Sequence, residues 1–174
     1  MNYFEFYQLP IAFKIDAKKL KRKFYEYSRK YHPDFFVQAS ASEQEDVLEK
    51  ATINNKAFKT LSNLNSRIKY VLECKGIIEE GEKYQLPPMF LMEMMEVNEA
   101  LMDLQFEADA ANLKQITQQV NRIEADLFES VSYIIENYKD GVSDESDLKK
   151  VKDFYFKKRY LLRIRESLNK FAAD

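Results

Sequence analysis

Residues that interrupt helices are rare in this sequence: its 174 positions include only three glycines and four prolines. Average usage would supply about 12 glycines and about nine prolines in a chain of this length. Sheets and tight turns depend on both residue types, so a chain with so few of them is expected to consist mostly of long helices. The longest apolar runs are only a few residues long, too short to span a bilayer. We therefore predict an all-α protein.

The seven interruptions divide the chain into segments whose apolar residues follow helical spacing. The predicted helices cover about residues 3–9, 16–31, 43–61, 67–74, 89–107, 113–138 and 145–172. The apolar residues expected to form the core face of the helix at 113–138 are Leu113, Ile116, Val120, Ile123, Leu127, Ile134 and Tyr138. Asp16 is a good N-cap, and Pro10 and Pro33 are expected to end the helices before them. The predicted organisation is a helical N-terminal domain at 1–76, a short linker at 77–87 and a C-terminal three-helix bundle at 88–174.

The net charge of −2 hides a strong division of charge along the chain. Residues 1–75 carry 14 basic and nine acidic side chains, residues 76–147 carry four and 17, and residues 148–174 carry nine and three. Such blocks mark surfaces that attract partners of opposite sign. A protein that binds only nucleic acid is disfavoured, because the acidic block would repel phosphate.

The number of cysteines limits the possible cofactors, and the first residues of the chain indicate its location. With one cysteine, Cys74, the chain can form neither an intrachain disulfide nor a CxxC metal site. We expect no metal and no other cofactor. The first residues lack the basic and apolar regions of a signal peptide, so we expect a cytoplasmic location.

The helix predicted at 16–31 has one apolar face and one basic face. Its basic side chains are Lys18, Lys19, Lys21, Arg22, Lys23, Arg29 and Lys30, and apart from the N-cap Asp16 its only acid is Glu26. A basic face can be an ordinary solvated surface, but so little compensating charge favours an acidic partner. His32-Pro33-Asp34 follows directly. Histidine in the last turn and the proline after it would also serve as a plain helix stop.

His32 and Asp34 could also be interpreted as an acid–base pair. Proline between them fixes a turn but does not hold a carboxylate against an imidazole as in a catalytic triad. His32 is the only histidine, and no nucleophile or metal ligand is gathered near it in the sequence. A hydrolytic enzyme is therefore poorly supported.

Residues 1–75 resemble a J-domain, the module that stimulates ATP hydrolysis by DnaK-type heat-shock chaperones. The resemblance rests on Tyr3-Phe4 and Leu9, on the basic helix ending in Tyr31-His32-Pro33-Asp34, and on Asn55, Ala57-Phe58 and Leu61. It implies a helical hairpin with short flanking helices, which docks the basic face on an acidic surface of the chaperone. It also implies that Asp34 reaches an arginine of the ATPase domain and that His32 and Pro33 shape the loop. The chaperone-binding residues so implied are Lys18, Arg22, Arg29, Lys30, His32, Pro33 and Asp34.

Two positions depart from the usual J-domain pattern. Phe35 stands where most J-domains have lysine, and Asn54 stands before Asn55 where an apolar residue is usual. The chain also lacks the Gly/Phe-rich stretch and the cysteine-rich module of general folding J-proteins.

In the helix predicted at 89–107, methionines lie outside the face expected to form the core. Phe90, Met94, Val97, Leu101 and Leu104 share the core face, which leaves Leu91, Met92, Met95 and Met102 interleaved with Glu96, Glu99 and Asp103. A neighbouring helix could cover these residues. Alternatively they form an adaptable binding patch with an acidic rim.

This region resembles the C-terminal domain of the HscB family, J-proteins dedicated to iron–sulfur cluster biogenesis. The residues that carry the resemblance are Phe90-Leu91-Met92-Glu93, Glu96, Glu99, Arg159-Tyr160 and, in the N-terminal domain, Ala51-Thr52-Ile53-Asn54. It implies that the bundle binds an IscU-type cluster scaffold protein through Leu91, Met92, Met95, Glu96, Glu99, Asp103 and Tyr160. It also implies a DnaK- or HscA-type chaperone as the second partner, and no catalytic activity of its own.

The sequence leaves alternatives to this function. One alternative is a J-protein that serves a different client, and another is a purely structural helical adaptor, which would not need Asp34. The basic block at 148–174 has no function assigned from the sequence: it either pairs with the acidic helices before it or meets a partner.

Overall fold

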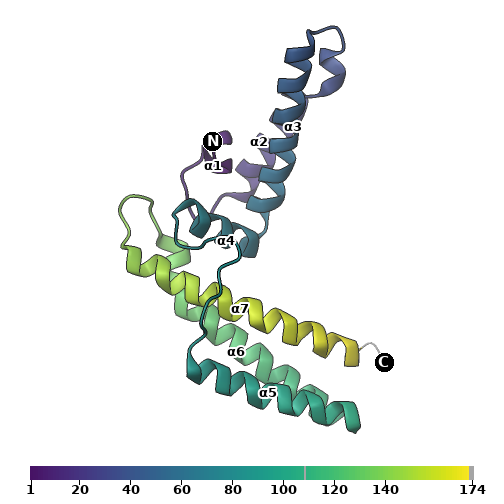
Figure 1. The fold of residues 1–174 in the computed structure, drawn as a ribbon, viewed down its shortest axis with the longest axis vertical. Coiled ribbons are helices and arrows are strands. Elements are labelled where there is room, and N and C mark those ends of the chain that lie inside the picture. The colour runs from purple at the N-terminus through teal and green to yellow at the C-terminus, as the bar shows by residue number, and fades with distance from the viewer. Residues whose placement is uncertain (108, 173–174) are drawn as a thin grey trace. The chain divides into compact units, whose positions relative to one another are not determined.

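The regular structure of the described residues, 1–107 and 109–172 of the computed structural model, is entirely helical (Figure 1). The elements are α1 (Tyr3–Phe6), α2 (Ala17–Lys30), the short 3₁₀ helix η1 (Pro33–Phe36), α3 (Ala41–Ser62), α4 (Leu64–Cys74), α5 (Pro88–Phe106), α6 (Ala110–Asn137) and α7 (Glu145–Ala172). The all-α prediction is confirmed. None of the helices described is both long and apolar enough to cross a membrane.

The chain divides into two compact units. Unit 1 comprises Met1–Gly76 together with Ile135–Ser143, and unit 2 comprises Ile77–Ile134 together with the chain from Asp144 onward. The last residues of α6 and the loop after it thus pack with the N-terminal residues. The domain boundaries given above, at 76 and 88, stay a prediction.

Unit 1 is built around the hairpin of α2 and α3. Leu20 of α2 is buried, and Phe24 stacks on Phe58 of α3 with ring centroids 4.2 Å apart. Ala57 and Leu61, which lie one helical turn apart on α3, have no exposed surface. The apolar face of α2 therefore meets α3, which leaves its opposite, basic face to solvent.

Residues 135–143 are attached to unit 1 by one aromatic contact and by ion pairs. Tyr138 packs edge-on against Phe13, with ring centroids 5.1 Å apart. Lys75 Nζ lies 2.7 Å from Asp140 Oδ1, and this hydrogen bond holds the pKa of Asp140 below its usual value. Lys14 also pairs with Glu136.

One buried polar side chain, Asn54, links three elements of unit 1. It is 1% exposed. Its Oδ1 accepts the Tyr7 hydroxyl at 2.7 Å, and its Nδ2 donates to the Phe24 carbonyl at 3.1 Å and to Ser28 Oγ at 3.0 Å. Every polar atom of the side chain is thus satisfied, so an asparagine fits where an apolar residue is usual.

Replacing Asn54 with alanine is expected to lower the free energy of unfolding by about 2–4 kcal/mol, since it removes three hydrogen bonds and leaves a cavity. Urea denaturation measures the change. Asn55→Ala, at the exposed neighbouring position, is the matched control and should cost about 0.5 kcal/mol or less. Equal losses for the two variants would contradict the importance of the buried hydrogen bonds.

Unit 2 consists of three helices, with α6 antiparallel to both α5 and α7 (Figure 1). All five residues expected on the core face of α5 are buried. They pack with side chains of α6 and α7, namely Ile116, Val120, Ile123, Leu161, Ile164 and Leu168. The predicted bundle packing of these helices is therefore observed within the unit.

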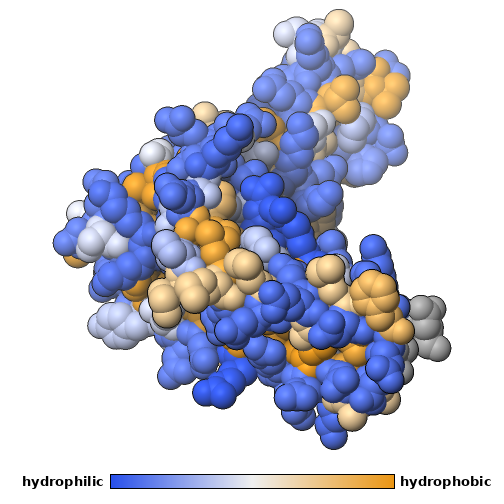
Figure 2. Space-filling model, turned by 60° about the horizontal axis from the view of Figure 1, so that its bottom comes forward, coloured by the Kyte–Doolittle hydropathy of each residue, from blue (hydrophilic) through white to orange (hydrophobic). Residues whose placement is uncertain are grey.

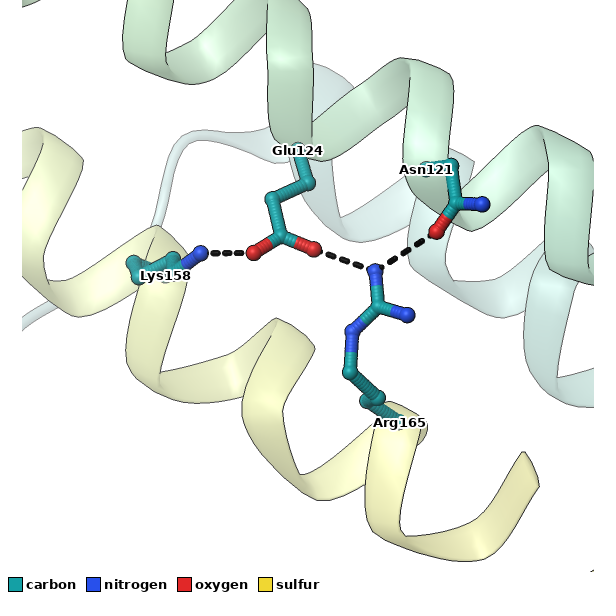
Figure 3. Close-up of polar contacts among 4 residues, drawn as sticks. All are labelled: Asn121, Glu124, Lys158 and Arg165. Carbon is teal, nitrogen blue, oxygen red and sulfur yellow. Dashed lines mark hydrogen bonds and ion pairs between the residues drawn. The ribbon is translucent and has the colours of Figure 1, made fainter. Parts of the chain in front are cut away.

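A charged cluster joins α6 to α7 beside this core (Figure 3). Glu124 of α6 pairs with Lys158 and with Arg165 of α7 through different carboxylate oxygens. Arg165 Nη2 also donates to Asn121 Oδ1 at 2.9 Å. Burial acts to raise the pKa of Glu124, but the two hydrogen bonds from the cations outweigh it and hold the pKa below its usual value.

Replacing Glu124 with glutamine is expected to lower the free energy of unfolding by about 1–3 kcal/mol at pH 7, because two partly buried cations lose their shared carboxylate. The folded-state pKa of Glu124 is depressed, so its contribution is complete above the unfolded-state pKa of about 4.3 and is lost as the pH falls through the folded-state pKa. The difference between wild type and variant should therefore shrink below about pH 4. Urea denaturation from pH 7 to pH 3 tests this, and a constant difference would contradict it.

Several predicted helix ends are corrected by the structure. The first helix ends at Phe6 rather than Leu9, because Gln8 adopts a left-handed φ of 53°. The Leu9 N–H then donates to the Phe4 carbonyl and closes the helix. α3 begins at Ala41 rather than Glu43, since Ser40 and Glu43 form a capping box. Part of the loop expected after Pro33 is the helix η1. α4 begins at Leu64 rather than at residue 67, because the Asn63 side chain caps it by accepting the Ser66 N–H.

One predicted core position of α6 is also corrected. Ile135, rather than Ile134, is buried, together with Val131 and Tyr138. From Ile135 to Ser143 the chain packs with unit 1, so the buried position there is set by the contacts of that unit and not by the core of the three-helix bundle.

Candidate functional site

The basic face of α2 is the first candidate surface. Lys18, Arg22, Arg29 and Lys30 are all exposed. No basic side chain of α2 forms an ion pair with any described residue. Lys30 lies over the rings of Tyr27 and Tyr31, 5.9 and 5.3 Å from their centroids, so its position is fixed by aromatic neighbours rather than by an acid. The charge of this face is available to an external partner.

The loop at the end of α2 holds His32, Pro33 and Asp34 in a defined geometry. His32 is the N-cap of η1: its Nδ1 accepts the Asp34 backbone N–H at 3.3 Å. Pro33 occupies the first turn of η1, where its missing N–H costs nothing. The Asp34 carboxylate is 83% exposed, and one of its oxygens lies 3.7 Å from His32 Nδ1. Asp34 therefore points outward with an oxygen free for a partner. We call residues Lys18, Arg22, Arg29, Lys30, His32, Pro33 and Asp34 the α2 surface.

The same geometry disfavours an acid–base pair. The Nδ1 that a catalytic carboxylate would orient is already an acceptor for the Asp34 backbone N–H. The ring is half exposed, and it does not line the open hollow between η1 and α3. The loop is therefore suited to a contact and not to proton transfer.

Apolar side chains beside Asp34 were not predicted as site residues. Phe35, Val37 and Leu48 are 74%, 67% and 59% exposed. An open hollow of about 420 Å³ lies between η1 and α3, lined by Pro33, Asp34, Phe36, Val37, Gln44 and Leu48 among others. The run Phe35-Phe36-Val37 directly after Asp34 was the available signal, since three consecutive apolar residues are unusual in an exposed loop.

The second candidate surface is the outer face of α5. Leu91, Met92, Met95 and Met102 are all exposed, as expected. Leu91, Met95 and Met102 follow one another at i, i+4 and i+11, and Phe106, at i+15, extends this stripe to the helix end and is 87% exposed. Sequence reasoning missed Phe106, although the same spacing could have found it. Figure 2, which turns the bottom of Figure 1 toward the viewer, shows apolar side chains among hydrophilic ones over the three-helix unit.

Carboxylates line one side of this stripe. Glu96, Glu99 and Asp103 lie at i, i+3 and i+7 and are exposed. None of them forms an ion pair with a described residue. The stripe and its acidic rim combine apolar area with uncompensated negative charge, which suits a protein partner with basic groups around an apolar patch.

Tyr160 of α7 is placed against α5 by two contacts. Its hydroxyl accepts from Asn98 Nδ2 at 3.2 Å, and its ring is edge-on to Phe90 at 6.0 Å. Asn98 follows Met95 by three residues and Leu91 by seven, so Tyr160 borders the stripe. We call Leu91, Met92, Met95, Glu96, Glu99, Asp103 and Tyr160 the α5 surface; within unit 2 the fold brings all seven to one region.

No group of three or more metal-binding side chains is present among the described residues. Cys74 is half-buried against Tyr70, and burial raises the pKa of its thiol. Neither observation points to a cofactor site.

Comparison with known proteins gives a consistent match. Residues 86–169 match the model of the HSCB C-terminal oligomerisation domain. The mouse iron–sulfur cluster co-chaperone protein HscB is 32% identical over 168 residues, which cover 96% of this chain and 67% of the mouse protein. The co-chaperone protein HscB homolog of Vibrio parahaemolyticus is 34% identical over 137 residues, or 73% of this chain and 80% of that protein. This chain belongs to the HscB family.

The fold of this HscB-family chain agrees with the sequence matches. The crystal structure of human co-chaperone protein HscB is similar with a TM-score of 0.75 and 32% identity, over 97% of this chain and 81% of the human one. The C-terminal match contains every residue of the α5 surface, and the similarity to the mouse and human proteins extends well beyond it. These HscB relatives are named co-chaperones, not enzymes.

Proposed function

We propose that this chain acts in the cytoplasm as a co-chaperone of iron–sulfur cluster assembly. It stimulates the ATPase of a DnaK- or HscA-type chaperone through the α2 surface and delivers an IscU-type scaffold protein bound on the α5 surface. The observation that carries the proposal is that one chain holds two exposed surfaces of opposite charge, and neither is neutralised by ion pairs with the described residues. Membership of the HscB family supports it.

On the α2 surface, the basic side chains supply attraction and Asp34 supplies the specific contact. Four exposed cations speed the encounter with an acidic surface and set its orientation. The outward carboxylate of Asp34 then accepts a charge-assisted hydrogen bond from an arginine of the chaperone, as the J-domain resemblance implies. Pro33 and the His32 cap fix the backbone at Asp34 before binding, which reduces the entropy cost of the contact.

On the α5 surface, the methionine side chains supply apolar area that adapts to the scaffold, and the acidic rim orients basic groups around it. Carrying both binding surfaces on one chain raises the effective concentration of the scaffold at the chaperone. ATP hydrolysis is thereby coupled to capture of the scaffold, and the iron–sulfur cluster is cargo that passes to an acceptor protein.

Transfer of the cluster from a loaded scaffold to an apo-acceptor, followed by absorbance, tests the function. With chaperone and ATP present, adding the chain should accelerate transfer. Omitting ATP, or replacing the chain by its Asp34→Asn variant, should remove the acceleration. A transfer rate that does not respond to the chain would contradict a role in cluster delivery and leave a J-protein with a different client.

A further inference from the structure

Helix α7 has most of its basic side chains in ion pairs with acidic side chains of the same chain. Its nine basic residues include six that form ion pairs. Lys158 and Arg165 share Glu124 (Figure 3), Lys152 pairs with Glu82, and Lys157 pairs with Asp153. Among the described residues, three basic side chains of α7 have no ion pair: Arg159, Arg163 and Lys170.

Arg159 and Arg163 form an adjacent pair. They lie at i and i+4, on one face of α7, and both are exposed. Two like charges at this spacing repel each other, so the pair does not stabilise the helix. Glu166, the nearest carboxylate along the helix after Arg163, forms no ion pair with either. Folding alone therefore gives no reason for the pair.

The two arginines line one side of a small aromatic hollow. Its other walls include Tyr84, Leu86, Phe156 and Tyr160. Tyr84 and Phe156 stack with ring centroids 4.6 Å apart, and the Tyr84 hydroxyl donates to Asp153 at 2.8 Å, so this wall is fixed by its own contacts. Glu82 also lines the hollow but is paired with Lys152, and Asp153, which binds Tyr84, is paired with Lys157.

The hollow is continuous with the α5 surface through Tyr160. That ring lines the hollow and also contacts Phe90 and Asn98 of α5. The volume of the hollow, about 210 Å³, is below the range of about 300–1,000 Å³ that is typical of small-molecule sites. It suits one or two side chains of a bound protein better than a nucleotide.

We propose that Arg159 and Arg163 are a second, ionic part of the scaffold-binding surface and bind a carboxylate-bearing segment of the protein held on the α5 surface. This inference rests on the function proposed above. Guanidinium groups bind carboxylates through two parallel hydrogen bonds, and an adjacent aromatic wall partly excludes water from the contact. The complete surface then has a carboxylate rim on α5, an apolar stripe, and two arginines on α7. Such a bipolar arrangement sets the orientation in which the scaffold binds.

Calorimetric titration with the cluster-free scaffold protein tests the inference. The double variant Arg159→Ala/Arg163→Ala should bind about 10-fold more weakly or worse, and its affinity should depend less on salt than that of the wild type. Lys149→Ala/Lys150→Ala is the matched control. It removes the same charge from the same helix outside the hollow and should change affinity about 2-fold or less. Thermal unfolding of the arginine variant should be unchanged or shifted upward, which separates a binding role from a structural one.

The outcomes separate this inference from the proposed function. Unchanged binding by the arginine variant, with binding lost in Leu91→Ala/Met92→Ala, would overturn the role of the arginines and leave the function standing. If the arginine and lysine variants lost the same amount of affinity, net charge alone would explain the loss, and the specific role of the arginines would also be overturned. Displacement of the scaffold by inorganic phosphate at concentrations where chloride has no effect would assign the arginines to a phosphate ligand instead.

Discussion

Replacing Asp34 with asparagine is expected to reduce stimulation of the chaperone ATPase to the basal rate without unfolding the protein. The carboxylate is 83% exposed and its only ion-pair neighbour among the described residues is His32, so the fold loses little when its charge is removed. The contact with the chaperone, in contrast, loses a charge-assisted hydrogen bond at its centre. Steady-state phosphate release measures the rate, and circular dichroism checks the fold.

Glu49→Gln is the matched control for this variant. Glu49 is an exposed carboxylate of α3 without an ion pair to a described residue, so the substitution changes the net charge equally outside the α2 surface. It should keep full stimulation. If Asp34→Asn stimulated the chaperone as well as Glu49→Gln does, the assignment of the α2 surface to chaperone binding would be wrong.

Truncating Leu91 and Met92 together to alanine is expected to weaken scaffold binding by about 2–4 kcal/mol, or about 30- to 1,000-fold. Both side chains are exposed in the free protein, at 38% and 60%, so their apolar area is available to be buried by the scaffold. The core face of α5 is left intact, and the midpoint of thermal unfolding should move little. Calorimetry gives the affinity, and ATPase stimulation in the absence of scaffold should stay at the wild-type level.

Leu162→Ala is the matched control for this double variant, because it also truncates an exposed leucine to alanine. Leu162, on α7, is 40% exposed, nearly the same fraction as Leu91, and it is not among the residues that line the hollow beside Tyr160. Its truncation should leave the affinity for scaffold unchanged. An equal loss in Leu162→Ala would show that bundle stability, and not the α5 surface, controls binding.

Helix positions followed from the sequence because interruptions are scarce and apolar spacing is regular. Asp16 caps α2 because its side chain accepts backbone N–H groups, and α5 starts at the proline pair 87–88 because proline is favoured in the first turn of a helix. The early end of the first helix could not be predicted, because the left-handed residue there is Gln8, not the glycine usual at such positions. The start of α3 was available from the Ser40 and Glu43 pattern, a capping box that the polar composition of the loop concealed.

The candidate surfaces were predictable to different degrees. The α2 surface follows from a motif contiguous in sequence, and the stripe on α5 from helical spacing. The position of Tyr160 against Asn98 and the hollow beside Arg159 depend on how α5 and α7 pack, which spacing within one helix does not determine. The division of the α7 cations into paired and unpaired groups likewise appears only when their partners on α6 and in the segment before α5 are in place.

The most direct measurement of the central claim, that one chain couples the scaffold to the chaperone, is a titration of chaperone ATPase with the chain in the presence and absence of scaffold. The chain alone should stimulate hydrolysis, the scaffold alone should stimulate it weakly, and both together should exceed the sum of the two effects. Leu91→Ala/Met92→Ala should lose this synergy while keeping the stimulation by the chain alone. A purely additive response of the wild-type chain would contradict the claim.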